Sequence, residues 1–537
     1  MQSRNRCGRR WVAGTLVAVG LVAGLAGVGP APEVAGAERQ VPAPVPVEET
    51  TIAAVHREMR AGRLTCEALV QHYLRRIEAY DKQGPAINAL VLVNPRVVDE
   101  ARALDARRRA GEPTGALHCV PMIVKDNFET RDLPSTNGSL ALAGFVSAKD
   151  AFQVARVKAA GALVLAKSNL AEWAFTPYET VSSILPGYTK NPYALDRVTA
   201  GSSGGTAAAV AANFGLIGLG SDTGNSIRGP SSHQALVGMR STMGLTSRAG
   251  VMPLNLWADI AGPMGRTVED VARVFQVVAG EDPDDPVTAA ARGHRDGDYL
   301  AVLRADGLRG ARIGVLRQAY ERPDMDPEVV AVFRQALADL ERAGAVVIDP
   351  ATIEDLSAIR RPQGLDPCGG FKYDINRYLA SHGDRVPVKS LAEIVASGRF
   401  HPSVRRQLEQ TEQGPSHGPE TPACEADRAY RARMREAVLS TMARLQLDAF
   451  VYPTWSNPPR LIGDLNTPHG DNSQLFSPTT GFPALQVPMG YTRGGQLPAG
   501  LTFLGRAWED ATLFRLAYAY EQATRHRRPP ASAPPLR

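Results

Sequence analysis

The sequence predicts an α/β fold with a mostly buried β-sheet. Short apolar segments at residues 89–93, 119–124 and 162–166 have the length of buried strands, and they alternate with helical patterns at 95–109 and 151–160. Such alternation is typical of this fold class. The chain has 537 residues, of which 44% are hydrophobic and 21% charged, so it can bury a large core and does not resemble a disordered or fibrous protein.

The first 37 residues predict an export signal. Four arginines among the first ten residues precede an apolar run at 11–28, and Ala35-Gly36-Ala37 has the small-x-small form of a cleavage site. We expect cleavage after Ala37 and a secreted or periplasmic protein, exported by the Sec or, because Arg9 and Arg10 are paired, the twin-arginine route. The alternative is an uncleaved anchor, since about 18 apolar residues can just span a bilayer. After signal removal no membrane span is expected.

The chain that follows the leader begins with an extended segment and two helices. Residues 38–47 are rich in proline, which fixes φ and predicts an extended lead-in. Helical patterns follow at residues 51–59 and 66–80. In the second pattern apolar side chains recur at three-to-four spacing, and Thr65 is a suitable N-cap.

One domain is predicted over residues 48–527. The polar stretch 280–307 predicts a linker between its two halves, and the second half resumes with a strand at 311–316 and a helix at 329–343. Residues 411–424 predict a surface insertion, and residues 528–537 form a Pro-rich tail.

Cysteines and charges give no sign of a cofactor or of a nucleic-acid partner. Outside the leader the cysteines are Cys66, Cys119, Cys368 and Cys424, too far apart for a CxxC motif. An exported location permits a disulfide but leaves its pairing open, and the simplest expectation is burial as small apolar side chains. The net charge of +5 comes from scattered basic residues. We therefore expect no metal or other cofactor, no nucleic acid, a small-molecule or peptidic substrate, and either a monomer or a homodimer.

The first of three unusual segments is residues 120–127, where an apolar strand ends on Lys125. Burial disfavours the charged form of a lysine and lowers its pKa, and a lysine that acts as a base needs this environment. The plain alternative is a surface lysine whose stem packs on apolar neighbours.

The second segment is Gly201-Ser202-Ser203-Gly204-Gly205, which precedes an Ala-rich helical pattern at 206–213. Adjacent hydroxyls at a helix start lie where backbone N–H groups are unpaired. The segment also matches G-x-S-x-G, with Ser203 in the nucleophile position of an α/β-hydrolase elbow. It is not a P-loop, because the Gly-Lys-Ser/Thr ending is missing. The alternative is an ordinary turn.

The third segment, residues 220–230, is small and polar between the apolar runs 216–219 and 235–237. It predicts a tight loop that presents Ser226 together with neighbouring backbone amides, which can hold an oxyanion. The alternative is a loop closed by an Asx-turn.

Taken together, the three segments resemble the amidase-signature family. In that family a GSSGG segment is followed by G-[ST]-D-T-G-x-S-I-R, and an upstream Lys-Asp pair completes the site. The matching positions are Lys125, Ser202 and Ser226, and the two serines lie 24 residues apart. Flanking segments are similar at residues 190–193, 262–267, 481–484 and 497–501. The resemblance extends from about residue 48 to about residue 525.

The resemblance implies an amidase-signature fold, with a mixed, twisted sheet covered by helices on both faces, in a single catalytic domain. It also implies hydrolysis of carbon–nitrogen bonds in linear amides, which releases ammonia or an amine and a carboxylic acid. Ser226 would be the nucleophile that forms an acyl-enzyme, Ser202 would relay its proton, and neutral Lys125 would be the base.

Further residues are implied to support these three. The backbone amides of Thr223, Gly224, Asn225 and Ser226 would form the oxyanion hole. Ser203 would orient the lysine through a hydrogen bond, and Asp222 and Arg228 would brace the loop by pairing.

Two positions depart from the family pattern. Ala200 stands where the family commonly has the first glycine of a doubled pair, and Asn225 stands where it commonly has glycine. Because asparagine tolerates positive φ better than most residues, we expect the oxyanion loop to survive the change.

Other functions remain open from the sequence. A Ser-His-Asp esterase could use Ser203 with His233 as base, but it would leave Lys125 and the second serine unexplained. A non-catalytic binding protein could keep the fold without turnover. The tRNA amidotransferase A subunit is another member of the family, but its role is cytosolic and needs partner subunits, so the leader at residues 1–37 speaks against it. Residues 368–379 resemble bacterial amidases related to peptide amidases, which favours a C-terminal peptide amide or an N-acyl amine. Aryl amides, carbamates and esters would use the same site.

Overall fold

The computed structural model describes residues 47–294, 298–359 and 368–536. The predicted export signal and all of the predicted lead-in except Val47 lie outside these residues. Residues Val45–Arg537 form one compact unit. Among the described residues no helix combines the length and the apolar character needed to cross a bilayer.

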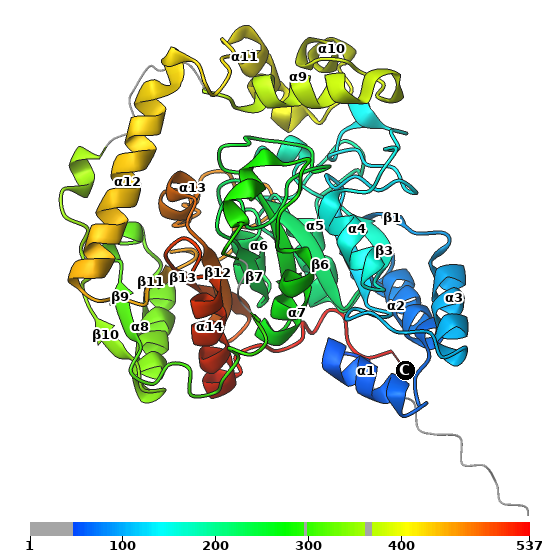
Figure 1. Cartoon of the computed structure of the whole chain (residues 1–537), viewed down its shortest axis with the longest axis horizontal. Coiled ribbons are helices and arrows are strands. Elements are labelled where there is room, and N and C mark those ends of the chain that lie inside the picture. Colours follow the sequence, from blue (N-terminus) through cyan, green and yellow to red (C-terminus); the bar gives the residue numbers. More distant parts are fainter. Residues whose placement is uncertain (1–46, 295–297, 360–367, 537) are drawn as a thin grey trace, which may run out of the picture. The chain divides into compact units, whose positions relative to one another are not determined.

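A large mixed sheet runs through this unit and confirms the predicted fold class (Figure 1). Over the described residues it has eleven strands in the order β1-β3-β2-β6-β8-β7-β12-β13-β11-β9-β10, and a small second sheet pairs β4 with β5. The strands are β1 (Leu90–Val93), β2 (Pro121–Lys125), β3 (Leu163–Ser168), β4 (Lys190–Asn191), β5 (Ala194–Val198), β6 (Ile217–Asp222), β7 (Val237–Arg240), β8 (Ile260–Gly265), β9 (Arg312–Val315), β10 (Val346–Ile348), β11 (Ala449–Pro453), β12 (Ala484–Thr492) and β13 (Leu497–Leu504).

Helices flank the sheet, and two of them show that both faces are covered. The helices are α1 (Ile52–Arg60), α2 (Cys66–Tyr80), α3 (Val97–Arg109), α4 (Phe152–Ala159), α5 (Gly204–Ala211), α6 (Arg228–His233), α7 (Val268–Val278), α8 (Pro327–Arg342), α9 (Phe371–His382), α10 (Leu391–Ser397), α11 (Arg405–Gln413), α12 (Glu425–Arg444), α13 (Phe476–Thr480) and α14 (Asp510–Thr524). Gly218 of β6 faces α5, whereas Gly265, the partner of Ile217 in the ladder, faces α7. Because neighbouring strand residues point to opposite faces, α5 and α7 lie on opposite sides of the sheet.

The helix predicted at residues 66–80 has these bounds in the structure, and the other predicted helices lie within one or two residues of their predicted bounds. The Thr65 hydroxyl accepts a hydrogen bond from the Ala68 amide at 3.1 Å, and α2 buries Leu69, Tyr73 and Ile77 on the core side. The strand predicted from residue 119 instead begins at Pro121. Cys119 has a φ of 55°, in the left-handed region, and cannot continue a strand.

The direction of β2 positions the candidate site. β2 runs parallel to β3 and to β6, with Lys125 opposite Ser168 and Val124 opposite Leu219. The carboxyl ends of parallel strands meet at one edge of the sheet, so Lys125 lies beside the end of β6, where the motif of the third segment begins.

Two disulfides correct the expectation that the cysteines are buried as separate apolar side chains. Cys66 at the start of α2 is bonded to Cys119 before β2, and Cys368 before α9 is bonded to Cys424 before α12. The partners are 53 and 56 residues apart in the sequence, and only the tertiary fold brings them together.

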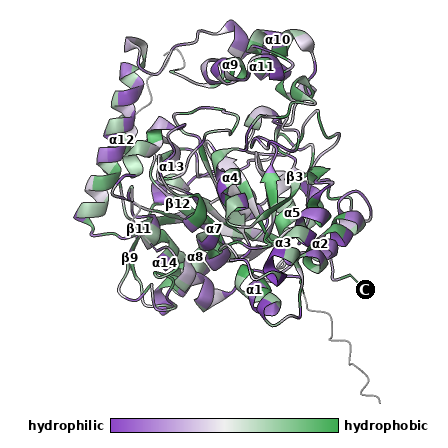
Figure 2. Cartoon of the chain, turned by 45° about the vertical axis from the view of Figure 1, so that its right-hand side comes forward, coloured by the Kyte–Doolittle hydropathy of each residue, from purple (hydrophilic) through white to green (hydrophobic). Residues whose placement is uncertain are grey.

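Helices α9, α10 and α11 form a group with its own core (Figure 1). Buried apolar side chains from these helices form one cluster with Trp173 and Phe145. The helices contribute Phe371, Ile375, Leu379, Leu391 and Leu408, among others. Figure 2 shows apolar and polar residues on each of the three helices, as expected when one face is buried. We call residues 371–413 the cap.

The two segments predicted to be irregular are both attached to the domain. In the described part of 280–307, Thr288, Ala291 and Tyr299 are buried, and Arg248 pairs with Asp285 at 2.6 Å. The stretch is therefore docked and not a free linker. The 411–424 segment begins within α11 and ends at the bridged Cys424, which is fully buried.

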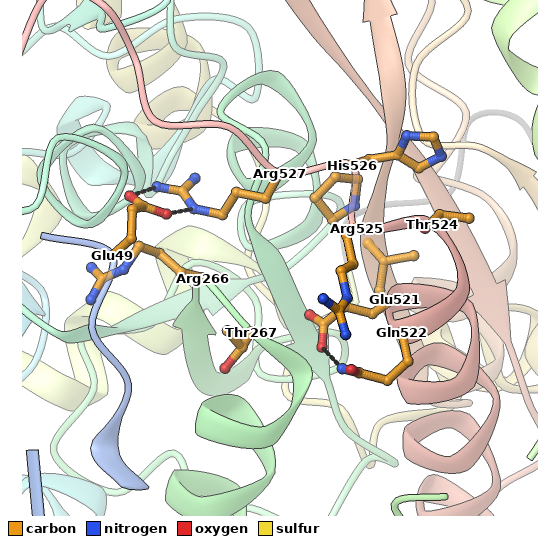
Figure 3. A pocket seen from close by; sticks show the side chains of 11 residues that line it. Glu49, Arg266, Thr267, Glu521, Gln522, Thr524, Arg525, His526 and Arg527 are labelled. Atoms are coloured by element: carbon orange, nitrogen blue, oxygen red, sulfur yellow. Dashed lines mark hydrogen bonds and ion pairs between the residues drawn. The ribbon is translucent and has the colours of Figure 1, made fainter. Parts of the chain in front are cut away.

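The end of the chain packs against its described beginning. Arg527 pairs with Glu49 through two hydrogen bonds of 2.8 Å (Figure 3). Further along the Pro-rich tail, the buried Arg76 of α2 donates to the carbonyls of Ala533 and Pro534. These contacts fix the tail on the helices that open the domain.

Candidate active site

Lys125 ends β2 in a fully buried position and contacts two hydroxyl groups. Its Nζ lies 2.7 Å from Ser202 Oγ and 2.8 Å from Ser221 Oγ. Burial lowers the pKa of Lys125 to about 7, although the charges of Asp222 and Asp259 raise it in part. A surface lysine is thereby ruled out, and this side chain is able to lose its proton near neutral pH.

Ser202 and Ser203 lie in the turn that leads into α5, as the Gly-Ser motif predicts. The Gly201–Ser202 peptide bond is cis, and Ser202 is fully buried. The amide of Ser203 donates to the carbonyl oxygen of Ser226 at 3.2 Å. This bond ties the turn to the loop that carries the second serine, so the two predicted serines belong to one site.

Ser226 lies in the loop between β6 and α6, at the wall of a cavity of about 260 Å³. Its exposed fraction is only 5%, and this cavity offers a route by which a substrate can reach it. The other lining groups are contributed by distant parts of the chain and include Phe175, Leu254, Asn255, Arg431, Gln474 and Thr479.

The four backbone amides predicted for the oxyanion hole are available to an anion. Within the described residues, the N–H groups of Thr223, Gly224, Asn225 and Ser226 donate no hydrogen bond, and all four residues line the cavity. Unpaired amides beside a nucleophile form a suitable oxyanion hole. Asn225 is not among the residues with positive φ, so the tolerance expected of asparagine is not needed here.

Asp222 and Arg228 brace the loop as predicted, and Arg240 joins them. Asp222 Oδ2 accepts hydrogen bonds from Arg228 Nε at 3.1 Å and from the amide of Ile227 at 3.1 Å, while Oδ1 accepts from Arg240 Nη1 at 3.0 Å. All three charged side chains are fully buried. Burial alone would raise the pKa of Asp222, but the two guanidinium groups hold this pKa at about 2.

The predicted hydrogen bond from Ser203 to the lysine is wrong. Ser203 Oγ donates to the carbonyl of Ser221 and accepts from its amide, so its hydroxyl faces the backbone of β6. Ser221 makes the contact with the lysine that was expected of Ser203. Its hydroxyl accepts a hydrogen bond from Lys125 and another, at 2.9 Å, from Asn127 Nδ2. The sequence contained one signal for Ser221, because it occupies the [ST] position of the matched motif.

His233, the base of the rival esterase, is not placed for that role. Its ring stacks on Trp455 with centroids 4.8 Å apart, and burial lowers the pKa of His233 to about 3. Ser203, its intended partner, is bonded to β6. His233 and Ser203 are therefore not arranged as a base and a nucleophile, and Lys125 is left as the candidate base.

A second cavity of about 250 Å³ lies beside the Glu49–Arg527 ion pair, between Arg266 and Glu521 (Figure 3). None of Lys125, Ser202 and Ser226 lines it. No cluster of three or more His, Cys, Asp or Glu side chains suited to a metal ion occurs among the residues that the structure describes.

Comparisons with known proteins agree with the fold and with the resemblance to the amidase-signature family. The sequence profile of the amidase family matches residues 68–514. A probable amidase from Arabidopsis thaliana is 32% identical over 499 residues, which cover 90% of this chain and 92% of that protein. The A-type subunit of the glutamyl-tRNA(Gln) amidotransferase from Moorella thermoacetica is 36% identical over 485 residues, covering 87% and 95%. The native peptide amidase from Stenotrophomonas maltophilia superposes with a TM-score of 0.80 at 37% identity, covering 90% of this chain and 99% of that structure.

Replacing Asp222 with alanine is expected to destabilise the fold by about 3–5 kcal/mol, because Arg228 and Arg240 would be left buried without a counter-charge. Urea unfolding at pH 7 measures the change. Since the pKa of Asp222 lies below the ordinary value of about 3.9, its contribution is present above that pH and is lost as the pH falls toward 2. The control is Asp306→Ala, which removes an exposed partner of Arg304 and should change little. Equal effects of the two variants would contradict the bracing role.

Proposed function

This chain belongs to the amidase family, and we propose that it hydrolyses amide bonds through an acyl-enzyme on Ser226, with Ser202 as proton relay and Lys125 as base. The observation that carries the proposal is the contact of 2.7 Å between Ser202 and a buried lysine whose pKa is lowered to about 7. Lysine can act as a base only when it is neutral, and burial brings that form into the physiological range.

In the acylation step, Ser226 Oγ attacks the amide carbonyl carbon while its proton passes to Ser202 and the proton of Ser202 passes to Lys125. The carbonyl electrons move onto oxygen, where the amides of residues 223–226 stabilise the negative charge. Removal of one such donor costs about 3–4 kcal/mol in other hydrolases. The intermediate collapses as the C=O bond re-forms and the C–N bond breaks. Ser202 gives a proton to the leaving nitrogen, Lys125 returns its proton to Ser202, and ammonia or an amine departs.

In the deacylation step, water attacks the ester on Ser226 and gives up its proton along the same relay. The ester bond to Ser226 breaks, the serine recovers its proton, and a carboxylic acid leaves. No group outside the chain needs to be supplied except water, so the site is chemically complete for hydrolysis.

For the substrate we propose a C-terminal peptide amide or an N-acyl amine, with aryl amides, carbamates and esters as alternatives. Support comes from the 37% identity to a peptide amidase whose length is almost fully covered. The cavity also combines apolar groups such as Phe175 and Leu254 with the amides of Asn255 and Gln474, which suits a peptide-like chain. The tRNA amidotransferase relative is similarly close in sequence, so its role is the second candidate.

Export is proposed together with the hydrolase function. The two disulfides support it, because such bonds persist mainly in oxidising compartments. The signal-like leader supports it as well. Both observations favour a stand-alone hydrolase over a component of an amidotransferase that works in the cytosol.

The relay predicts which variants lose acylation. Lys125→Ala and Ser226→Ala should abolish labelling by a fluorophosphonate and hydrolysis of a peptide amide, whereas His233→Ala should keep much of both. Mass spectrometry should locate the label on Ser226. Loss in His233→Ala with retention in Lys125→Ala would overturn the lysine relay, and unlabelled wild-type protein would favour a binding protein. Anilides, carbamates and esters in the same assay test the alternative substrates.

The pH profile should follow Lys125. Because its pKa is lowered to about 7 and the neutral form is the base, kcat/KM should rise through pH 7 and fall as the solution becomes more acidic. Measurement between pH 5 and pH 9 on a peptide amide tests this. His233→Gln should leave the midpoint unchanged, since the pKa of His233 is already about 3. A profile that is flat across neutral pH would contradict a lysine base.

The export proposal predicts a mature protein that begins at Glu38. N-terminal sequencing of protein recovered from the periplasm or the medium of the natural host tests it. Recovery from the cytosol alone with Met1 retained would reject export and strengthen the amidotransferase candidate.

A further inference from the structure

Residues 471–474 lie against the loop that carries the oxyanion amides and bind it at several points. Asn225 Nδ2 donates to Asp471 Oδ1 at 3.0 Å, and Arg228 Nη2 donates to the carbonyl of Ser473 at 3.3 Å. Gln474 Nε2 donates to Asp471 Oδ2 at 2.7 Å. Asp471 thus connects the loop to a segment 246 residues away in the sequence.

The carboxylate of Asp471 is buried and is held by hydrogen bonds. The residue is 8% exposed, and its carboxylate accepts from Asn225, from Gln474 and, at 2.9 Å, from the amide of Ser473. Burial raises the pKa of Asp471 to about 6, while these bonds and the charge of Arg228 lower it in part. Burial of a carboxylate costs free energy unless its oxygens accept hydrogen bonds. The hydrogen bond from Asn225 is one of those that offset this cost.

Close packing leaves the loop little freedom at this contact. A Cβ atom at Gly224 would come within 1.9 Å of Gln474 Oε1, and one at Gly229 within 2.5 Å of Asn225 Nδ2. The side chain of Asn225 therefore fills the space between the loop and the first turn of α6. Gln474 lines the same cavity as Ser226.

We propose that Asp471 is a positioning residue for amide hydrolysis, which acts through Asn225 to hold the oxyanion amides in the direction that the reaction needs. The inference rests on the proposed acylation of Ser226. Oxyanion donors work only within about 2.7–3.1 Å of the developing charge, and a misplacement of about 1 Å can lower a rate about 100-fold. A glycine at position 225 would offer no side chain for such a contact.

Four variants test the role: Asp471→Ala, Asp471→Asn, Asn225→Ala and the double variant Asn225→Ala/Asp471→Ala. Asp471→Ala should lower kcat on a peptide amide and the rate of fluorophosphonate labelling about 10- to 100-fold, with little change in KM. Asp471→Asn keeps an oxygen that can accept from Asn225 and should recover most of the rate. If Asp471 acts through Asn225, the double variant should be no slower than the slower single variant.

Asp510→Ala is the matched control. Asp510 is likewise buried, and its carboxylate accepts hydrogen bonds from the amide and the hydroxyl of Thr242, but it lies in α14 and not at the loop. Its replacement should lower Tm while kcat is kept. A kcat of Asp471→Ala equal to that of Asp510→Ala, or rate losses that multiply in the double variant, would overturn the positioning role. Wild-type protein without label on Ser226 would overturn the proposed function as well.

Discussion

The buried carboxylate of Asp222 fixes the geometry around which the site is built. It lies at the end of β6 and binds the side chain of Arg228, the side chain of Arg240 in β7 and the first amides of α6. One anion thereby sets the distance between a strand, the loop that follows it and the next helix. Ser226 and its neighbouring amides lie between these contacts in the sequence, so the ion cluster holds both ends of the loop that carries them.

Burial sets the charge of Lys125, against the influence of two nearby carboxylates. An unpaired carboxylate nearby would hold the lysine in its protonated form, because an opposite charge favours the ammonium ion. Asp222 is paired with two guanidinium groups, and burial outweighs the influence of Asp222 and Asp259 on the pKa of Lys125. The hydroxyl of Ser221 accepts a hydrogen bond from the lysine and another from the side-chain amide of Asn127, and neither of these two groups carries a formal charge.

Local patterns in the sequence were sufficient for six of the helices, such as the one at residues 66–80, and for the serine motifs. α2 begins and ends at the predicted residues because its cap and its apolar spacing are both local. The contribution of Ser221 depends on the register between β2 and β6, which no single segment contains. The direction of the Ser203 hydroxyl depends on the backbone of β6 in the same way. The disulfide partners are 53 and 56 residues apart and could not be paired from spacing. The role of Lys125 came from resemblance to a family, and the structure adds its burial and its partners.

The Cys368–Cys424 bond closes a loop that contains the cap. The ring of Phe371 in the cap packs on the ring of Phe175, with centroids 4.6 Å apart, and Phe175 lines the cavity at Ser226. The entropy cost of closing a loop grows only with the logarithm of its length, by about 0.6 kcal/mol for each doubling. A longer or shorter segment between the two cysteines would therefore change the closure cost little, while it would alter the packing of Phe371 beside the cavity that Ser226 lines.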